Sequence, residues 1–287
     1  PNEFIIAVKV IGPYLNFFAN KSMMAELIIK DILKEKGKFG SSHIGKGKKI
    51  TVEHTSINPN ASPHLGRARN ALIGDSIVRM LRFQGYDVDV HYFVNDVGKQ
   101  IAMLVLGAEG NKEKKKITFD NLLSIYIDIN RKLDEAPELE AKVLELLNRL
   151  EKGDKKIIGK FKRIVGICVK GQVKILSELG IKYDYFDYES KYLRSGKTDE
   201  TLKRLEKTGK LFIDGFNRWV LDQKGYGLGM KVPVLVLTRA DRTSLYPLRD
   251  IAYAIELAES AKNGNSIVVL GEDQKLYNEQ INAALKE

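Results

Sequence analysis

The sequence contains a single cysteine and only four histidines among its 287 residues. One cysteine excludes a disulfide within the chain, and Cys168 lies among apolar neighbours from Ile164 to Val169, which favours a buried, inert thiol. Four histidines without paired spacing do not support a structural zinc site. No apolar run reaches membrane-spanning length and no signal peptide opens the chain, so we expect a cytoplasmic protein with no membrane partner.

Hydrophobic residues make up 44% of the chain, which is enough for a packed core and excludes wholesale disorder. The net charge is +10, from 47 Lys and Arg against 37 Asp and Glu. Such an excess favours a polyanionic partner through counterion release, but a solvated basic surface would have the same composition. The charge alone does not choose between the two.

Residues 48–75 hold the most informative local pattern. Residues 50–54 predict a short buried strand, 58–63 a proline-bounded loop, and 66–83 a helix that Gly85 ends. Such a crossing leaves backbone N–H groups at the positive end of a helix dipole, where a phosphate can bind. His64 and Arg67 flank Gly66 and can donate to phosphate oxygens, although an ordinary connection with an incidental histidine has the same spacing.

The rest of the chain alternates strands with helices. The pattern predicts strands at 87–94, 183–190, 232–237 and 266–270, and helices from 97 and at 156–179, 247–261 and 273–286. It therefore predicts an α/β fold with a Rossmann-like, doubly wound parallel sheet, whose ligands bind at the carboxyl ends of the strands. We expect the apolar run 232–237 to be a strand covered on both faces, as in parallel sheets.

Three further segments complete this interpretation. Asp214-Gly215 between two apolar runs predicts a hairpin, and charge-rich residues 108–155 predict a helical insertion that faces mostly solvent. Asn95 and Asp96 could cap the helix from 97, or they could form part of a site wall together with Gln100. Near the N-terminus, a strand over 4–10 and an amphipathic helix from Met23 to Lys36 precede a linker at 40–48.

Four stretches, in order along the chain, resemble class I arginyl-tRNA synthetases. Residues 64–67 (HLGR) resemble the "HIGH" signature, and 92–100 (YFVNDVGKQ) resemble the Y-x-N-D-x-G-x-Q element. Residues 239–250 (RADRTSLYPLRD) are similar to R-S-D-G-T-S-L-Y-x-T-R-D, and 268–274 resemble the strand and loop that follow. The resemblance runs from about residue 50 to residue 287 and is more specific than any one motif.

This resemblance implies a domain plan. Residues 1–47 would be the end of an N-terminal accessory domain and its linker, and 12–18 (GPYLNFF) resemble the end of the family's tRNA-binding domain. Residues 48–107 would begin the catalytic domain, 108–155 would be the insertion, and 156–287 would continue the domain. No K-M-S-K-like loop follows residue 274 and no anticodon-binding bundle is visible, so we expect the second half of the catalytic fold to be missing or supplied elsewhere.

The activity implied by the resemblance is ATP-dependent activation of L-arginine and its attachment to tRNA(Arg), by a monomer. Mg²⁺ would come with the nucleotide, without a dedicated protein site. The implied catalytic residues are His64 and Arg67. The implied ATP-binding residues are His64, Gly66, Arg67, Asn70, Gly271, Asp273 and Gln274, and the implied arginine-binding residues are Glu53, Ser56, Asn58, His64, Tyr246, Asp250 and Gln274.

Other interpretations stay open at this point. Tyr246 and Asp250 lie four residues apart at a helix start, where an Asp favoured by the dipole and a packed Tyr would be equally at home. Arg67, Arg242 and Gln274 depart from the family's pattern. The alternative function is therefore a truncated, non-catalytic synthetase paralogue that binds RNA or arginine, and a third is a class I synthetase for another amino acid.

Overall fold

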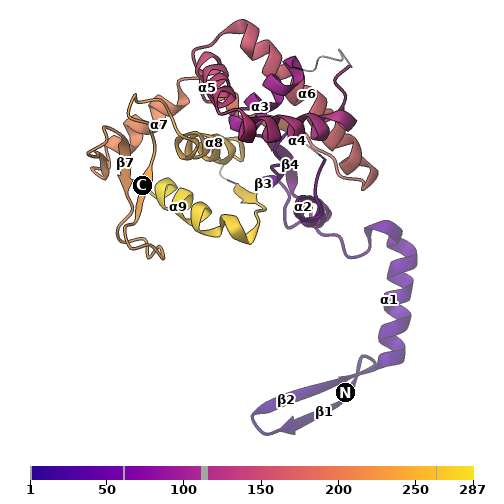
Figure 1. Ribbon diagram of the computed structural model, residues 1–287. Coiled ribbons are helices and arrows are strands. Elements are labelled where there is room, and N and C mark those ends of the chain that lie inside the picture. The colour runs from indigo at the N-terminus through magenta and orange to yellow at the C-terminus, as the bar shows by residue number, and fades with distance from the viewer. Residues whose placement is uncertain (1, 61, 111–115, 263) are drawn as a thin grey trace.

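The computed structural model describes residues 2–60, 62–110, 116–262 and 264–287, and its centre is a parallel sheet (Figure 1). The sheet contains β3 (Lys49–Thr55), β4 (Asp87–Val94), β5 (Tyr185–Tyr188) and β9 (Asn265–Val268). Their spatial order is β5-β4-β3-β9, and each neighbouring pair is parallel. Because the order reverses beside the first strand, the sheet has the switch point of a doubly wound fold, as predicted.

Helices cover both faces of this sheet. On one face α2 (Leu65–Phe83) buries Val78 against Ile50, Val52, Val88 and Val90. On the other face α8 (Tyr246–Ser260) packs Tyr253 and Leu257 around Phe93. Successive side chains of a strand point to opposite faces, so Glu53 lies toward α8 while His54 lies against Gly74 of α2.

The largest core lies among four helices rather than on the sheet. These are α3 (Lys99–Glu109), α4 (Phe119–Glu135), α5 (Glu138–Glu151) and α6 (Lys155–Glu178). Most of the described residues of the expected insertion at 108–155 are exposed or half-buried, in keeping with the expectation that it faces mostly solvent, while its inward residues join this core; they are Leu122, Ile129, Val143, Leu146 and Leu150. These residues help to cover α3, whose run Ile101–Val105 is buried on all sides and needs cover beyond what the sheet supplies.

A second, antiparallel sheet follows α7 (Lys197–Glu206). It contains β6 (Leu211–Ile213), β7 (Trp219–Asp222) and β8 (Val234–Val236) in that order, so the predicted hairpin is confirmed. The expected parallel placement of residues 232–237 is wrong, since β8 pairs antiparallel with β7. Leu235 and Leu237 are nevertheless buried, against α8 and α9 (Lys275–Leu285). The apolar run thus indicated that these side chains are buried, but not which strand β8 pairs with.

The N-terminal segment stands apart from the rest of the molecule (Figure 1). It is a hairpin of β1 (Ile5–Ile11) and β2 (Tyr14–Ala19) followed by α1 (Lys21–Glu35), which bears out the predicted strand and helix. None of the α1 residues is buried, and Val10 and Leu33 are 76% and 69% exposed. Within the described ranges, none of the helices combines the length and apolar character that crossing a bilayer requires.

Candidate active site

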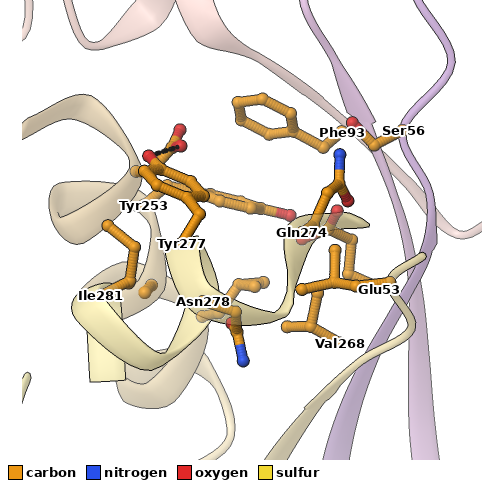
Figure 2. Close-up of a pocket in the computed structure, with 13 residues that line it drawn as sticks. Glu53, Ser56, Phe93, Tyr253, Val268, Gln274, Tyr277, Asn278 and Ile281 are labelled. Carbon is orange, nitrogen blue, oxygen red and sulfur yellow. Dashed lines mark hydrogen bonds between the residues drawn. The ribbon is translucent and has the colours of Figure 1, made fainter. Parts of the chain in front are cut away.

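A cavity of about 150 Å³ lies at the carboxyl ends of β3, β4 and β9, under α8 and α9 (Figure 2). It brings together four residues of the expected arginine-binding set from three separate segments: Glu53, Ser56, Asp250 and Gln274. Glu53 lies near the carboxyl end of β3 and Ser56 just after it, Asp250 faces Glu53 from α8, and Gln274 closes the short helix η3 (Glu272–Gln274). The walls between them are apolar and aromatic, including Phe93, Tyr253 and Val268.

Two carboxyl groups dominate the electrostatics of this cavity. Glu53 is only 7% exposed. Burial, together with the negative charges of Asp250 and Asp187, raises its pKa to about 8 against a weaker opposing hydrogen bond from Tyr253. Burial also raises the pKa of Asp250 to about 6, although a hydrogen bond from Tyr277 and the charge of Arg249 oppose the rise. Both shifts would be reversed by a cationic ligand, so the cavity favours a molecule with positive charge.

Asp250 is held by a tyrosine that sequence reasoning missed. The Tyr277 hydroxyl donates to Asp250 Oδ2 at 2.5 Å (Figure 2). Tyr246 packs on Tyr277, with ring centroids 5.3 Å apart and an interplanar angle of 49°. Tyr246 is itself 55% exposed and does not line the cavity. Its link to Asp250 is indirect, through the ring of Tyr277. The only available signal for Tyr277 was its position one helical turn after Gln274.

A second missed tyrosine joins Glu53 to residues beneath the cavity. The Tyr253 hydroxyl donates to Asp187 Oδ2 at 3.1 Å and also hydrogen bonds with Glu53. Asp187 in turn lies 2.7 Å from His91 Nδ1, so the chain Glu53, Tyr253, Asp187, His91 runs under the cavity floor. Burial and the nearby Glu53 charge raise the pKa of Tyr253, which therefore stays protonated between the two carboxylates. Its place three residues after Asp250, on one face of α8, was a readable signal.

Asn58 lies in a neighbouring cavity of about 170 Å³ rather than beside Glu53. Its side-chain amide donates to Gln100 Oε1 at 3.0 Å, and Asn95 lines the same space. The predicted capping role of Asn95 and Asp96 is wrong, because the N-cap residue of α3 is Gly98. Asp96 instead accepts from the backbone N–H of Ser190 at 2.7 Å and so fixes the segment after β5.

The residues expected to bind the nucleotide at the start of α2 lie outside both of these cavities. His64 is the exposed N-cap residue of α2 and makes no side-chain cap hydrogen bond, and its ring folds over Gly66, where an added Cβ would lie 3.3 Å from Cε1. Arg67 and Asn70 lie half-buried in the first two turns of α2, and position 61 of the preceding loop is outside the described residues. The start of α2 thus presents open backbone N–H groups at the same edge of the sheet as the Glu53 cavity.

The loop after β9 contributes the remaining residues that were expected to bind ATP, from the opposite side of the switch point. Gly271 begins η3, and a Cβ there would lie 2.4 Å from Asp273 Oδ1. Asp273 itself is exposed, so of this group only Gln274 lines the Glu53 cavity. Among the described residues, no three His, Cys, Asp or Glu side chains are grouped closely enough to hold a metal ion.

Comparison with known proteins agrees with this geometry. The family described as "tRNA synthetases class I (R), catalytic domain" matches residues 28–287. The "Arginine--tRNA ligase" of Methanocaldococcus jannaschii is 39% identical over 293 residues, which cover 99% of this chain and 50% of the relative. The ligase of Archaeoglobus fulgidus is 35% identical over 285 residues, which cover 99% of this chain and 50% of that one. The chain spans about half the length of the curated relatives it matches.

Solved structures show the same fold. The arginyl-tRNA synthetase of Thermus thermophilus has a TM-score of 0.68 at 27% identity, covering 89% of this chain and 42% of that one. The Plasmodium falciparum enzyme has a TM-score of 0.75 at 20% identity, covering 100% of this chain and 50% of that one. The parallel sheet, the ordered motifs and the match over residues 28–287 agree, and the chain belongs to the family of class I arginyl-tRNA synthetase catalytic domains.

Proposed function

We propose that this chain, working within a longer protein, activates L-arginine with ATP and transfers it to tRNA(Arg) in the cytoplasm. The observation that carries the proposal is the convergence of Glu53 and Asp250 on one buried cavity. Free arginine carries two cationic groups, an α-ammonium and a guanidinium, and two separate acids match that pattern. A cavity with a single acid and an aromatic wall would instead suit a ligand with a single cationic group.

The two acids take different ends of the amino acid in this proposal. Asp250, oriented by Tyr277 and flanked by Tyr246, receives the guanidinium, because a carboxylate offers two acceptors to a planar fork of donors. Glu53 and Ser56 receive the α-ammonium, and Gln274 completes the wall. Asn58 serves the carboxylate from the neighbouring cavity, which opens beside the same loop.

The nucleotide is assigned to the start of α2 and the loop after β9. In the proposed reaction the arginine carboxylate attacks the α-phosphate of ATP, an adenylate forms, and pyrophosphate leaves. Negative charge grows on that phosphate, so donors held at its edge lower the barrier. His64, the Gly66 backbone and Arg67 supply these donors, while Asn70, Gly271 and Asp273 support the nucleotide. Mg²⁺ arrives with the nucleotide.

Arginine binding by calorimetry tests the proposal. Asp250→Asn keeps the shape of the side chain but removes its charge, so arginine affinity should fall on the order of tenfold or more. Asp31→Asn, on the exposed face of α1, is the matched control and should bind as the parent does. Lysine and citrulline should bind the parent weakly, since one lacks the fork and the other lacks the charge. A folded parent that does not bind arginine would contradict the proposal.

Arg67 favours a second candidate, a non-catalytic module that binds arginine or RNA. It stands in the first turn of α2, where the family signature has a second histidine, and its longer side chain is always charged. Arginine-dependent exchange of pyrophosphate into ATP, measured with tRNA(Arg) present on the longest natural form of the protein, separates the two candidates. Exchange supports the enzyme. Arginine binding without exchange, restored by Arg67→His, supports the module.

A further inference from the structure

A larger cavity, of about 390 Å³, lies outside the site described above. It is enclosed by the end of α5, the start of α7 and the loop before α8. Its polar lining residues are Glu151, Arg194, Thr198, Asp199, Arg242, Thr243 and Ser244. We propose that this cavity binds one backbone phosphate of the RNA substrate, an inference that rests on the proposed function because it takes the RNA to be a tRNA.

Thr198 is the first observation that points to a ligand. The residue is only 8% exposed, yet it lines the cavity. Its hydroxyl makes no hydrogen bond to any other group in the described part of the chain. The hydroxyl faces the cavity and keeps contact with solvent there, because the described side-chain atoms that are both enclosed and unpartnered are Nε2 of His54 and Nε2 of His91. A ligand oxygen in the cavity can therefore accept from Thr198 in place of water.

The start of α7 provides the second observation. The N-cap residue is Gly196, which has a φ of 74° and no side chain to accept from the first turn. The helix runs for ten residues, so its uncapped N–H groups and its dipole favour an anion at Thr198. Asp199 opposes the anion in part. The other acid in the lining, Glu151, is already paired with Arg239 at 3.1 Å.

Two guanidinium groups complete the cavity. The Arg194 guanidinium makes no hydrogen bond or ion pair to the residues that the structure describes, although its charge acts on Asp96. Arg242 is held in place, because it stacks over Trp219 at 5.1 Å and donates to Asn217 at 2.7 Å. Its φ of 71° lies in the left-handed region, which is unfavourable for a residue other than Gly. A planar guanidinium suits phosphate oxygens.

A phosphodiester fits this cavity better than a nucleoside triphosphate does. The lining has two arginines without an acidic partner but also the exposed Asp199, so it matches one negative charge rather than several. Asp199 can instead accept from a ribose hydroxyl of the same strand. The position agrees, because Ser244 of the lining lies two residues before Tyr246, where α8 leads to the arginine cavity. RNA held here would have its end close to the proposed reaction.

Binding of a tRNA(Arg) transcript, followed by fluorescence anisotropy over a series of salt concentrations, tests the inference on the full chain. Arg194→Ala should reduce the slope of log affinity against log salt by about 0.9, the value for one lost phosphate contact. Thr198→Val should weaken tRNA binding on the order of tenfold and leave the slope unchanged, because it removes a neutral donor. Arg204→Ala is the matched control. It lies on the same helix, lines a different pocket and should change neither quantity.

Two measurements keep the outcomes distinct. Arginine affinity by calorimetry should be unchanged in all three variants, and if the parent binds no arginine the proposed function has failed rather than this inference. ATP affinity should also be unchanged. If ATP affinity falls in Arg194→Ala or Thr198→Val while tRNA binding stays constant, the cavity binds a free nucleotide and the inference is overturned. An unchanged salt slope for folded Arg194→Ala, an exposed side chain whose removal does not disturb packing, would overturn it as well.

Discussion

Glu53 couples the stability of the protein to pH. Its pKa rises from 4.5 to about 8 on folding, so the folded state holds its proton more tightly than the unfolded chain does. The stability that this provides is fully present below pH 4.5 and is lost as the pH rises through about 8. Above that pH a buried carboxylate must be ionised in an apolar cavity.

Glu53→Gln should remove this loss, because an amide has no proton to release. We expect the midpoint of thermal unfolding to fall less between about pH 5 and pH 9 than it does in the parent. Asp31→Asn, which changes an exposed carboxylate on α1, should follow the parent curve. Parallel curves for the parent and Glu53→Gln would mean that Glu53 does not titrate as described.

Arginine binding should release protons for the same reason. Near pH 7 the Glu53 carboxyl is mostly protonated and Asp250 is mostly ionised, since their pKa values are about 8 and about 6. An ammonium group beside Glu53 would favour the ionised form, and up to about one proton should leave. Calorimetric heats measured in two buffers of different ionisation enthalpy should therefore differ. The difference should vanish in Glu53→Gln.

Sequence reasoning at this scale found the acids but not their supports. Glu53 and Asp250 stood in recognisable motifs, whereas Tyr253 and Tyr277 matter because of where α8 and α9 place them. Tyr277 reaches Asp250 across 27 positions of sequence, and no local pattern encodes that contact. The separation of Asn58 from Glu53 also depends on the fold, since a turn after β3 sends the two side chains into different cavities.

Among the elements, α2 packs unusually closely on β3. A Cβ on Gly74 would lie 1.9 Å from His54 Cβ, inside any allowed contact. The approach buries His54, and this burial lowers its pKa to about 4, so the ring is neutral at the sheet surface. The position of the α2 N-terminus over the sheet edge depends on this contact.

Gly74→Ala should accordingly destabilise the protein by about 1–3 kcal/mol, because the helix must move away from the strand. Gly159→Ala on α6 makes the same chemical change where nothing lies within 4 Å, and it should stabilise by about 0.5–1 kcal/mol. Urea denaturation of both variants measures these changes. Equal effects of the two substitutions would contradict the close-packing account.

Periodicity predicted elements better than it predicted their neighbours. The helix at 66–83 and the strand at 87–94 emerge within one residue as α2 and β4. The strand β8 was predicted in the wrong sheet, because the burial of a strand does not determine which strand it pairs with. The solvent-facing sides of α4 and α5 were expected, but the packing of their apolar stripes on α3 and α6 was not, because a stripe does not identify its partner.

At the scale of the whole molecule, β1 and β2 contact mainly each other, and within the described residues neither they nor α1 makes more than isolated contacts with the parallel sheet and its helices. Deleting residues 1–36 should leave the unfolding midpoint of the rest nearly unchanged. It should also reduce binding of a hydrophobic dye, because the segment exposes large apolar side chains such as Val10, Leu15 and Leu33. A midpoint lowered by several degrees would show that the segment supports the sheet after all.

The family and the α/β class were readable from the ordered motifs, since each motif sits at a strand end and keeps its place in the sequence. How the chain divides into domains stays a prediction, as do the roles of the site residues. The spatial grouping of the site could not be read from sequence, because it depends on the order of strands in the sheet. Two clusters nearly two hundred positions apart meet only because β9 lies beside β3.

The alternation along β3 also constrains how this protein can vary. Glu53 and His54 are adjacent in the chain yet serve opposite sides of the sheet, one at the cation cavity and one against Gly74. Gaining or losing one residue in the strand before Glu53 would move each of them to the opposite face, so Glu53 would leave the cavity and His54 would leave its contact with Gly74. Insertions and deletions that survive selection should therefore fall before residue 49 or after residue 55, and the length of β3 itself should stay constant.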